Sequence, residues 1–269
     1  MRKLILGVAA AAFLALPASA KQPSGDAAAA NAQAQALGRL IYLHDQSAWQ
    51  GTDALRAEID FADHPELRGY VVNPLDNGHL GLVFFAEDAD GFYEFARYEV
   101  AESKVVGGGL VQGEERVRLS PLLKRMVAAR RAAVEEFQRR DWGLCTRHAA
   151  NFVALPPNED DVIVTYLLTS TEEAGVYPFG GHYRVDVGPK GEVVSARPFT
   201  NSCLNMELRR GPKGEEPIAL GVSHLMDDHP TEIHYFQSYY VPAQVFVMID
   251  GDVWAIEKGA FREMVDLGQ

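Results

Sequence analysis

The chain has 269 residues, and its 37 Asp and Glu outnumber its 25 Lys and Arg, which gives a formal net charge of −12 at pH 7. Binding to nucleic acid or to anionic lipid requires clustered basic residues, so we predict neither as a partner. The length is sufficient for one large or two small hydrophobic cores.

Residues 1–20 have the pattern of a bacterial Sec-type signal peptide. Basic residues at 2–3 precede an apolar run at 4–16 that is too short to span a bilayer, and Ala18-Ser19-Ala20 matches the small-x-small pattern that signal peptidase reads. Position 21 is Lys instead of the Cys of a lipoprotein. We predict cleavage after Ala20, a periplasmic or secreted product, and no integral membrane segment in the remainder.

The next part of the chain is expected to be a linker and helices followed by strands. Residues 21–35 are interpreted as a linker and the start of a first helix, Ala27–His44, and Thr52 is expected to cap a second, short helix that ends near Glu58. Residues 36–113 are predicted to form an N-terminal unit in which helix precedes an antiparallel meander. Its strands are predicted at 69–75, 80–86, 92–100 and 104–111, with Asn77-Gly78 and Asp90-Gly91 as turns.

The clearest helix signal lies at residues 120–142. Ser120 is a favoured N-cap, and Pro121 follows at the first helical position, where its missing N–H costs nothing. Arg130 falls inside the apolar stripe of this helix, so we expect it to pair with a carboxylate or to extend its stem to water. The alternative is an anion-binding or site-organising role. The stripe consists of Leu123, Met126, Val127, Ala133, Val134 and Phe137.

Cys145 and Cys203 are the two cysteines of the chain. In an oxidising compartment two cysteines usually pair, and we predict a disulfide in preference to a two-sulfur metal site or a catalytic thiol. This disulfide would tie the end of the 120–142 helix to a predicted hairpin at 182–197.

Residues 114–269 are predicted to form a second unit, which contains the 120–142 helix and a second meander. The fold class is therefore predicted to be α+β, with two helix-plus-antiparallel-meander units, and the missing βαβ alternation argues against a doubly wound parallel sheet. The predicted strands of this unit are 161–169, 182–187, 192–197, 217–223, 231–240, 245–249 and 253–256.

Two groups of residues are candidate sites in the second unit. His224, Asp228 and His229, with Asp227 between them, carry side chains that zinc and other transition metals accept, although their spacing does not match H-E-x-x-H. The alternative interpretation is a polar loop between two strands.

The second group consists of candidate binding residues on predicted strands. A strand at 231–240 would place Tyr235 and Tyr239 on one face, where an exposed tyrosine row stacks on sugars or contacts a protein. His182 and Arg184 form a polar row on another strand, and Arg130 completes the set of candidate binding residues. The alternatives are burial of both faces of the first strand and an ordinary solvent-facing second strand.

The three segments that resemble enzyme or ligand-binding motifs each lack a required feature. Ser223 lacks the second glycine of a nucleophile elbow, residues 87–91 lack the acid spacing of an EF-hand, and Gly107–Gly109 is not a phosphate-binding loop. We predict no cofactor and a non-catalytic exported module that binds a protein or cell-envelope component. The alternative is an envelope-directed hydrolase or metal-dependent enzyme that uses the cluster His224, Asp227, Asp228 and His229.

Overall fold

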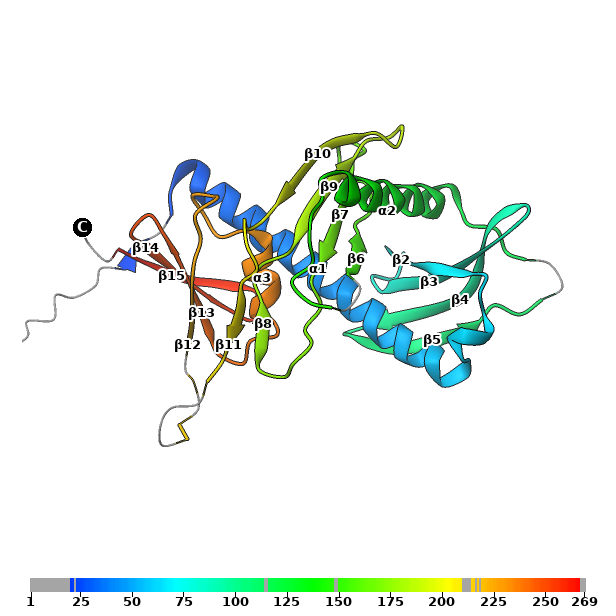
Figure 1. Cartoon of the computed structure of the whole chain (residues 1–269), viewed down its shortest axis with the longest axis horizontal. Helices are drawn as coiled ribbons and strands as arrows, with labels where there is room; N and C mark the ends of the chain where they lie inside the picture. The colour runs from blue at the N-terminus through cyan, green and yellow to red at the C-terminus, as the bar shows by residue number, and fades with distance from the viewer. Residues whose placement is uncertain are drawn as a thin grey trace, which may run out of the picture.

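The computed structural model in Figure 1 has the predicted α+β fold. It describes residues 20–21, 23–113, 116–147, 150–209, 214–215, 217 and 219–266, so positions 1–19 of the predicted signal peptide lie outside the described residues. In the described ranges, no helix is long and apolar enough to cross a membrane.

The first helix runs through most of the length of the molecule, and the other elements pack along it (Figure 1). This helix, α1 (Gly25–Glu58), has 34 residues. The predicted break between Ala27–His44 and a second helix capped by Thr52 is therefore wrong. Thr52 lies inside α1, where its hydroxyl donates to the Ala48 carbonyl at 2.6 Å instead of capping a helix.

Two glycines inside α1 explain why the helix can pack so closely on its neighbours. A Cβ built on Gly38 would lie 2.5 Å from the Cβ of Tyr235, and one built on Gly51 would lie 2.1 Å from a Leu82 methyl carbon. Glycine lowers helix propensity, but here it lets the backbone approach another element. Close packing therefore outweighs propensity at both positions.

The N-terminal meander is an antiparallel sheet in the order β2-β3-β4-β5, which confirms the predicted strands. Asn77-Gly78 lies in the first connection as predicted, but the second turn is Ala89-Asp90 instead of Asp90-Gly91, because Gly91 already pairs with Asp88. Its inner face packs on the C-terminal half of α1, where Leu55 lies against Leu82 and Tyr98. A 3-10 helix, Phe61–Asp63, connects α1 to this sheet. The strands are β2 (Leu67–Pro74), β3 (Leu80–Asp88), β4 (Gly91–Ala101) and β5 (Lys104–Leu110).

The predicted helix start at Ser120 is confirmed. Helix α2 (Pro121–Arg139) begins where the Ser120 hydroxyl accepts a hydrogen bond from the Leu123 N–H at 3.3 Å, and it ends three residues before the predicted limit. Leu123, Met126 and Val127 pack between the meander and the central sheet.

The central sheet has the order β10-β9-β7-β6 and is antiparallel. A two-stranded ribbon, β8 with β11, lies beside it and was not predicted, because strands of three residues carry almost no periodicity. These strands are β6 (Asn151–Ala154), β7 (Ile163–Leu168), β8 (Val176–Pro178), β9 (Tyr183–Val187), β10 (Val193–Pro198) and β11 (Asn205–Glu207).

The last sheet lies at the opposite end of α1 from the meander (Figure 1) and has the order β1-β15-β14-β13-β12. Asp250-Gly251 forms the predicted turn, with positive φ at both residues. The pair β12–β13 is parallel, and a helix makes the crossover. The strands are β1 (Ala20–Lys21), β12 (Ala219–Ser223), β13 (Gln244–Ile249), β14 (Asp252–Glu257) and β15 (Ala260–Asp266).

The crossover helix is α3 (Glu232–Ser238), so the strand predicted at 231–240 is wrong. The Thr231 N–H donates to His234 Nδ1 at 2.9 Å, which satisfies one of the free donors of the first turn. All seven residues of α3 are buried. A helix that is buried on every side shows no amphipathic period. Without that period, the aromatic residues of this segment led to the prediction of a strand.

Candidate functional site: a cleft along helix α1

A cleft of about 750 Å³ lies where α1, the central sheet and α3 meet. Its volume is within the range of small-ligand sites. We call it the α1 cleft. It is lined by Asp45, Ala48, Trp49, Thr52, Arg56, Tyr70, Asn151, Leu168, Thr169, Ser170, Thr171, Ala174, Gly175, Tyr177, Phe236, Gln237 and Tyr240.

One side of the α1 cleft is a single stripe of α1. Asp45, Trp49, Thr52 and Arg56 recur at steps of three and four residues, so the helix places all of them on one face. Trp49 is 54% exposed, although tryptophan is highly buried on average, and it forms part of the cleft wall. The stripe offers a carboxylate, an indole and a guanidinium along about three turns.

Asp45 is partly buried in this wall and is held by neutral donors. The Tyr240 hydroxyl donates to Asp45 Oδ2 at 2.6 Å, and the Asn151 amide donates to Oδ1 at 3.3 Å. Gln46 in turn donates to the Tyr240 hydroxyl at 2.9 Å. Burial raises the pKa of Asp45 against the opposing effect of these two hydrogen bonds. The carboxylate is therefore fixed in position by neutral groups, and no charged side chain among the described residues pairs with it.

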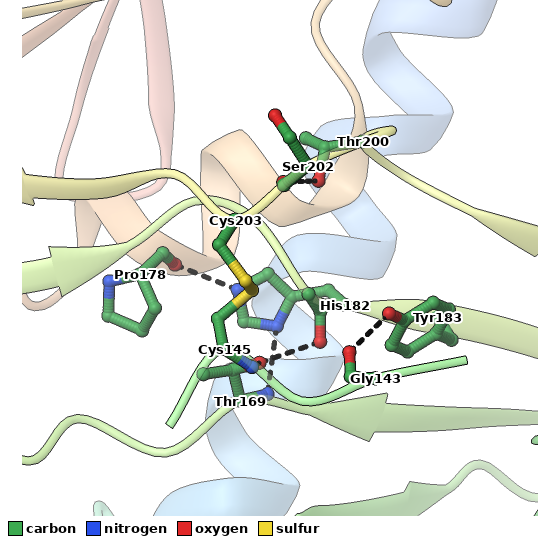
Figure 2. The surroundings of a disulfide bond; sticks show 10 residues. Gly143, Cys145, Thr169, Pro178, His182, Tyr183, Thr200, Ser202 and Cys203 are labelled. Carbon is green, nitrogen blue, oxygen red and sulfur yellow. Dashed lines mark hydrogen bonds between the residues drawn. A yellow bond between two sulfur atoms is a disulfide. The ribbon is translucent and has the colours of Figure 1, made fainter. Parts of the chain in front are cut away.

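The opposite wall, residues 168–177, is attached to the disulfide. Cys145 and Cys203 are bonded as predicted, with their Cα atoms 5.3 Å apart (Figure 2). Thr169 lines the cleft, and its hydroxyl donates to the Gly181 carbonyl at 2.7 Å and accepts from the Cys145 N–H at 3.5 Å. The disulfide thus holds one wall of the α1 cleft.

His182 lies beside the disulfide and supports the same wall (Figure 2). Its Nε2–H donates to the Pro178 carbonyl at 2.7 Å, and its Nδ1 accepts from the Thr169 N–H at 3.3 Å. Burial lowers the pKa of His182 to about 4, so the ring is neutral at pH 7. His182 was predicted to lie on an exposed polar row, but it is completely buried.

The other predicted binding residues lie outside the lining of the α1 cleft. Tyr235 is buried and donates to Asn31 at 2.5 Å, and Tyr239 stacks on Tyr42 with ring centroids 4.1 Å apart. Arg184 donates to Asp186 and Glu232 at 2.7 and 3.1 Å. Ligand binding by these residues stays a prediction.

Arg130 lies in the interior face of α2, as predicted, and it remains partly exposed. Its guanidinium donates to the Tyr70 carbonyl at 3.0 Å and lies 4.6 Å from the centroid of the Phe152 ring. Among the described residues no carboxylate forms an ion pair with it, and burial lowers the pKa of Arg130. It lines a cavity of about 10 Å³ beside His44, room for a single water molecule.

The predicted metal ligands form two separate pairs. His224 Nε2 lies 2.8 Å from Asp227 Oδ2, and His229 Nδ1 lies 2.6 Å from Asp228 Oδ1. Arg197 also donates to both carboxylate oxygens of Asp227, at 2.7 and 2.6 Å. In the part of the chain that the structure describes, no three or more His, Cys, Asp or Glu side chains are placed to hold a metal ion.

The sequence contained a signal for the α1 cleft that our interpretation missed. Asp45, Trp49 and Arg56 share a helix face only if one helix continues through residues 45–52, where we predicted a break. A tryptophan between an acid and a base on such a face is the combination of aromatic and polar groups that lines ligand sites. Comparisons with protein-family models, with curated proteins and with solved structures return no match to this chain.

Proposed function

We propose that this protein is exported to the cell envelope and binds a small ligand in the α1 cleft without transforming it. The observation that carries the proposal is the cleft itself, which combines about 750 Å³ of space with an exposed Trp49 and a fixed carboxylate at Asp45. Ligand sites typically combine apolar walls with a few placed polar groups in this way.

The chemistry of the lining favours binding over catalysis. Asp45 is the single carboxylate among the described lining residues, and no histidine, cysteine or lysine accompanies it there. Glycoside hydrolysis generally uses a pair of carboxylates, and nucleophilic catalysis needs a nucleophile beside a base. The alternative, an enzyme built on His224, has less support, because His224 is buried and Asp227 is already paired with Arg197.

Export is supported by two features. The pattern of residues 1–20 predicts cleavage after Ala20, and the disulfide between Cys145 and Cys203 is typical of an oxidising compartment. Cell fractionation followed by N-terminal sequencing tests this part of the proposal. We expect periplasmic or secreted protein whose first residue is Lys21, and a cytoplasmic protein with residues 1–20 intact would contradict it.

A thermal-shift screen of the mature protein against a chemically diverse library tests the binding function. A ligand at about 100 times its Kd adds about 3 kcal/mol of stability, which raises the Tm of a chain of this size by about 5–10 °C. We expect Trp49→Ala to lose the shift. Leu225→Ala is the control, because Leu225 is 91% exposed and lies outside the cleft lining.

The outcomes separate the alternatives. A shift that survives in Trp49→Ala places the ligand elsewhere and contradicts the α1 cleft as the site. If chromatography shows that the protein converts the bound compound into a product, the non-catalytic part of the proposal is contradicted. A screen that yields no ligand would contradict the proposed binding function as a whole.

A further inference from the structure

The carboxylate of Asp45 has hydrogen-bonding capacity that the described residues leave unused. An ionised carboxylate accepts at about four lone-pair positions, and Tyr240 and Asn151 occupy one on each oxygen. Both donors are neutral. A partly buried carboxylate is generally stabilised by a positive charge, and none of the described residues forms an ion pair with Asp45, so a bound cation is suited to supply that charge.

The nearby protein cations are occupied elsewhere. Arg56 lines the same cleft, but it is eleven positions further along α1, about 16 Å at 1.5 Å per residue, and it pairs with Asp53 at 3.5 Å. Arg130 donates to the Tyr70 carbonyl and contacts the Phe152 ring. Within the described ranges neither arginine forms an ion pair with Asp45.

The walls around Asp45 suit an organic cation. Trp49 is one turn from Asp45 on the same face of α1, so the two side chains are neighbours, about 6 Å apart at Cβ. Tyr70, Tyr177 and Tyr240 also line the cleft. Aromatic faces attract cations within about 6 Å, most strongly at tryptophan. The net charge of −12 favours the approach of a positive ligand over a negative one.

We infer that the ligand of the α1 cleft is an organic cation with N–H donors, an ammonium or amidinium-type group, which pairs with Asp45 while its apolar part lies against Trp49. This inference rests on the proposed binding function and names the ligand class of that site. The positive group donates to the free lone pairs of Asp45, and Tyr240 and Asn151 hold the carboxylate in place. A neutral sugar would satisfy the hydrogen bonds but not the charge.

Matched probe pairs test the ligand class. Benzylamine and benzyl alcohol have the same ring and differ in charge, as do benzamidine and benzamide. We expect each cationic probe to bind the mature protein at least about ten-fold more tightly than its neutral partner, by isothermal titration or by Trp fluorescence. Asp45→Asn should reduce the ratio of cationic to neutral probe affinity to about one, because it removes the charge and retains an acceptor for Tyr240.

Asp26→Asn is the matched control, because Asp26 lies on the same helix, is exposed and is not part of the cleft lining. It removes one negative charge and should leave the ratio unchanged. Equal affinities within both pairs, or a preference that persists in Asp45→Asn, would overturn the inference.

Failure of the inference and failure of the proposed function remain distinguishable. If the library screen yields neutral or anionic ligands whose binding Trp49→Ala abolishes, the cleft is a binding site and the cationic class is wrong. If neither the four probes nor the library yields a ligand, the binding function and the ligand class both fail.

Discussion

The backbone of Gly181 lies directly against the side chain of Cys145. A Cβ on Gly181 would be 2.4 Å from Cys145 Sγ and 2.5 Å from the Thr169 hydroxyl, and the φ of Gly181 is +73°. The disulfide and the Thr169 hydrogen bonds leave these atoms little freedom to move. Gly181 is therefore required both by its conformation and by the close approach.

Gly181→Ala should lower the free energy of unfolding by about 2–5 kcal/mol, because overpacking adds to the cost of a positive φ. Gly191→Ala is the matched control, since Gly191 has a φ of +85° and nothing within 4 Å of its Cβ position. This variant should lose only the free energy that a Cβ costs at positive φ, about 1–2 kcal/mol. Urea denaturation measures both, and equal losses would contradict a packing role for Gly181.

Replacing both cysteines, Cys145→Ser with Cys203→Ser, should destabilise the protein by about 4 kcal/mol, because the bond closes a loop across 58 positions. It should also weaken ligand binding in the α1 cleft, since Thr169 loses a fixed neighbour. The Tm and the probe affinity measure the two effects.

The wild-type protein in reductant should resemble the double variant, and reductant should not change the double variant further. Loss of stability with unchanged probe affinity would show that the cleft wall does not depend on the disulfide.

Gly38→Ala should destabilise the protein by up to about 2 kcal/mol, because overpacking costs about 1–3 kcal/mol and the better helix propensity of alanine returns about 1 kcal/mol. The new Cβ would meet the Tyr235 Cβ at 2.5 Å and the Glu232 carbonyl at 2.8 Å, and these atoms belong to the buried helix α3. Chemical denaturation measures the change.

Gly51→Ala is the comparison variant, because its nearest neighbour is the end of the Leu82 side chain, which can change rotamer. It should cost less than Gly38→Ala. The reverse order would contradict the view that α3 fixes the distance between the two helices.

Local signals in the sequence predicted the features that depend on near neighbours. Ser120-Pro121 starts α2, Asp250-Gly251 makes a hairpin turn, and the two cysteines pair. Each of these follows from the preferences of a few adjacent residues or from a count. The α+β class follows from the order of the predicted helices and strands along the chain.

The features that the sequence did not predict depend on tertiary contacts. Helix α3 has no amphipathic period because all of its faces are buried, and Gly38 and Gly51 resemble helix-weakening residues until their packing partners are known. The α1 cleft brings together Asp45 and Tyr240, which are 195 positions apart. A single sequence gives no indication that residues so distant share a site.

The stability of the protein should fall as the pH decreases from about 6.5 to 4. Burial lowers the pKa to about 4 for His44 and His182 and to about 3 for His234, from the ordinary histidine value of 6.5. Between these values the unfolded chain binds protons that the folded chain does not, so protonation favours unfolding. Each histidine contributes a slope of up to about 1.4 kcal/mol per pH unit. Urea unfolding at pH 8, 6, 5 and 4 measures it, and a flat profile would contradict the burial of neutral histidines.

His44→Leu should make the protein less sensitive to acid. His44 Nδ1–H donates to the Leu40 carbonyl at 2.8 Å, whereas the buried Nε2 has no hydrogen-bond partner among the described residues. Leucine removes this unsatisfied atom and one titrating group at similar volume. At pH 5 we expect the variant to exceed the wild type in free energy of unfolding by about 2 kcal/mol more than it does at pH 8. A difference that is the same at both pH values would show that His44 does not contribute to acid sensitivity.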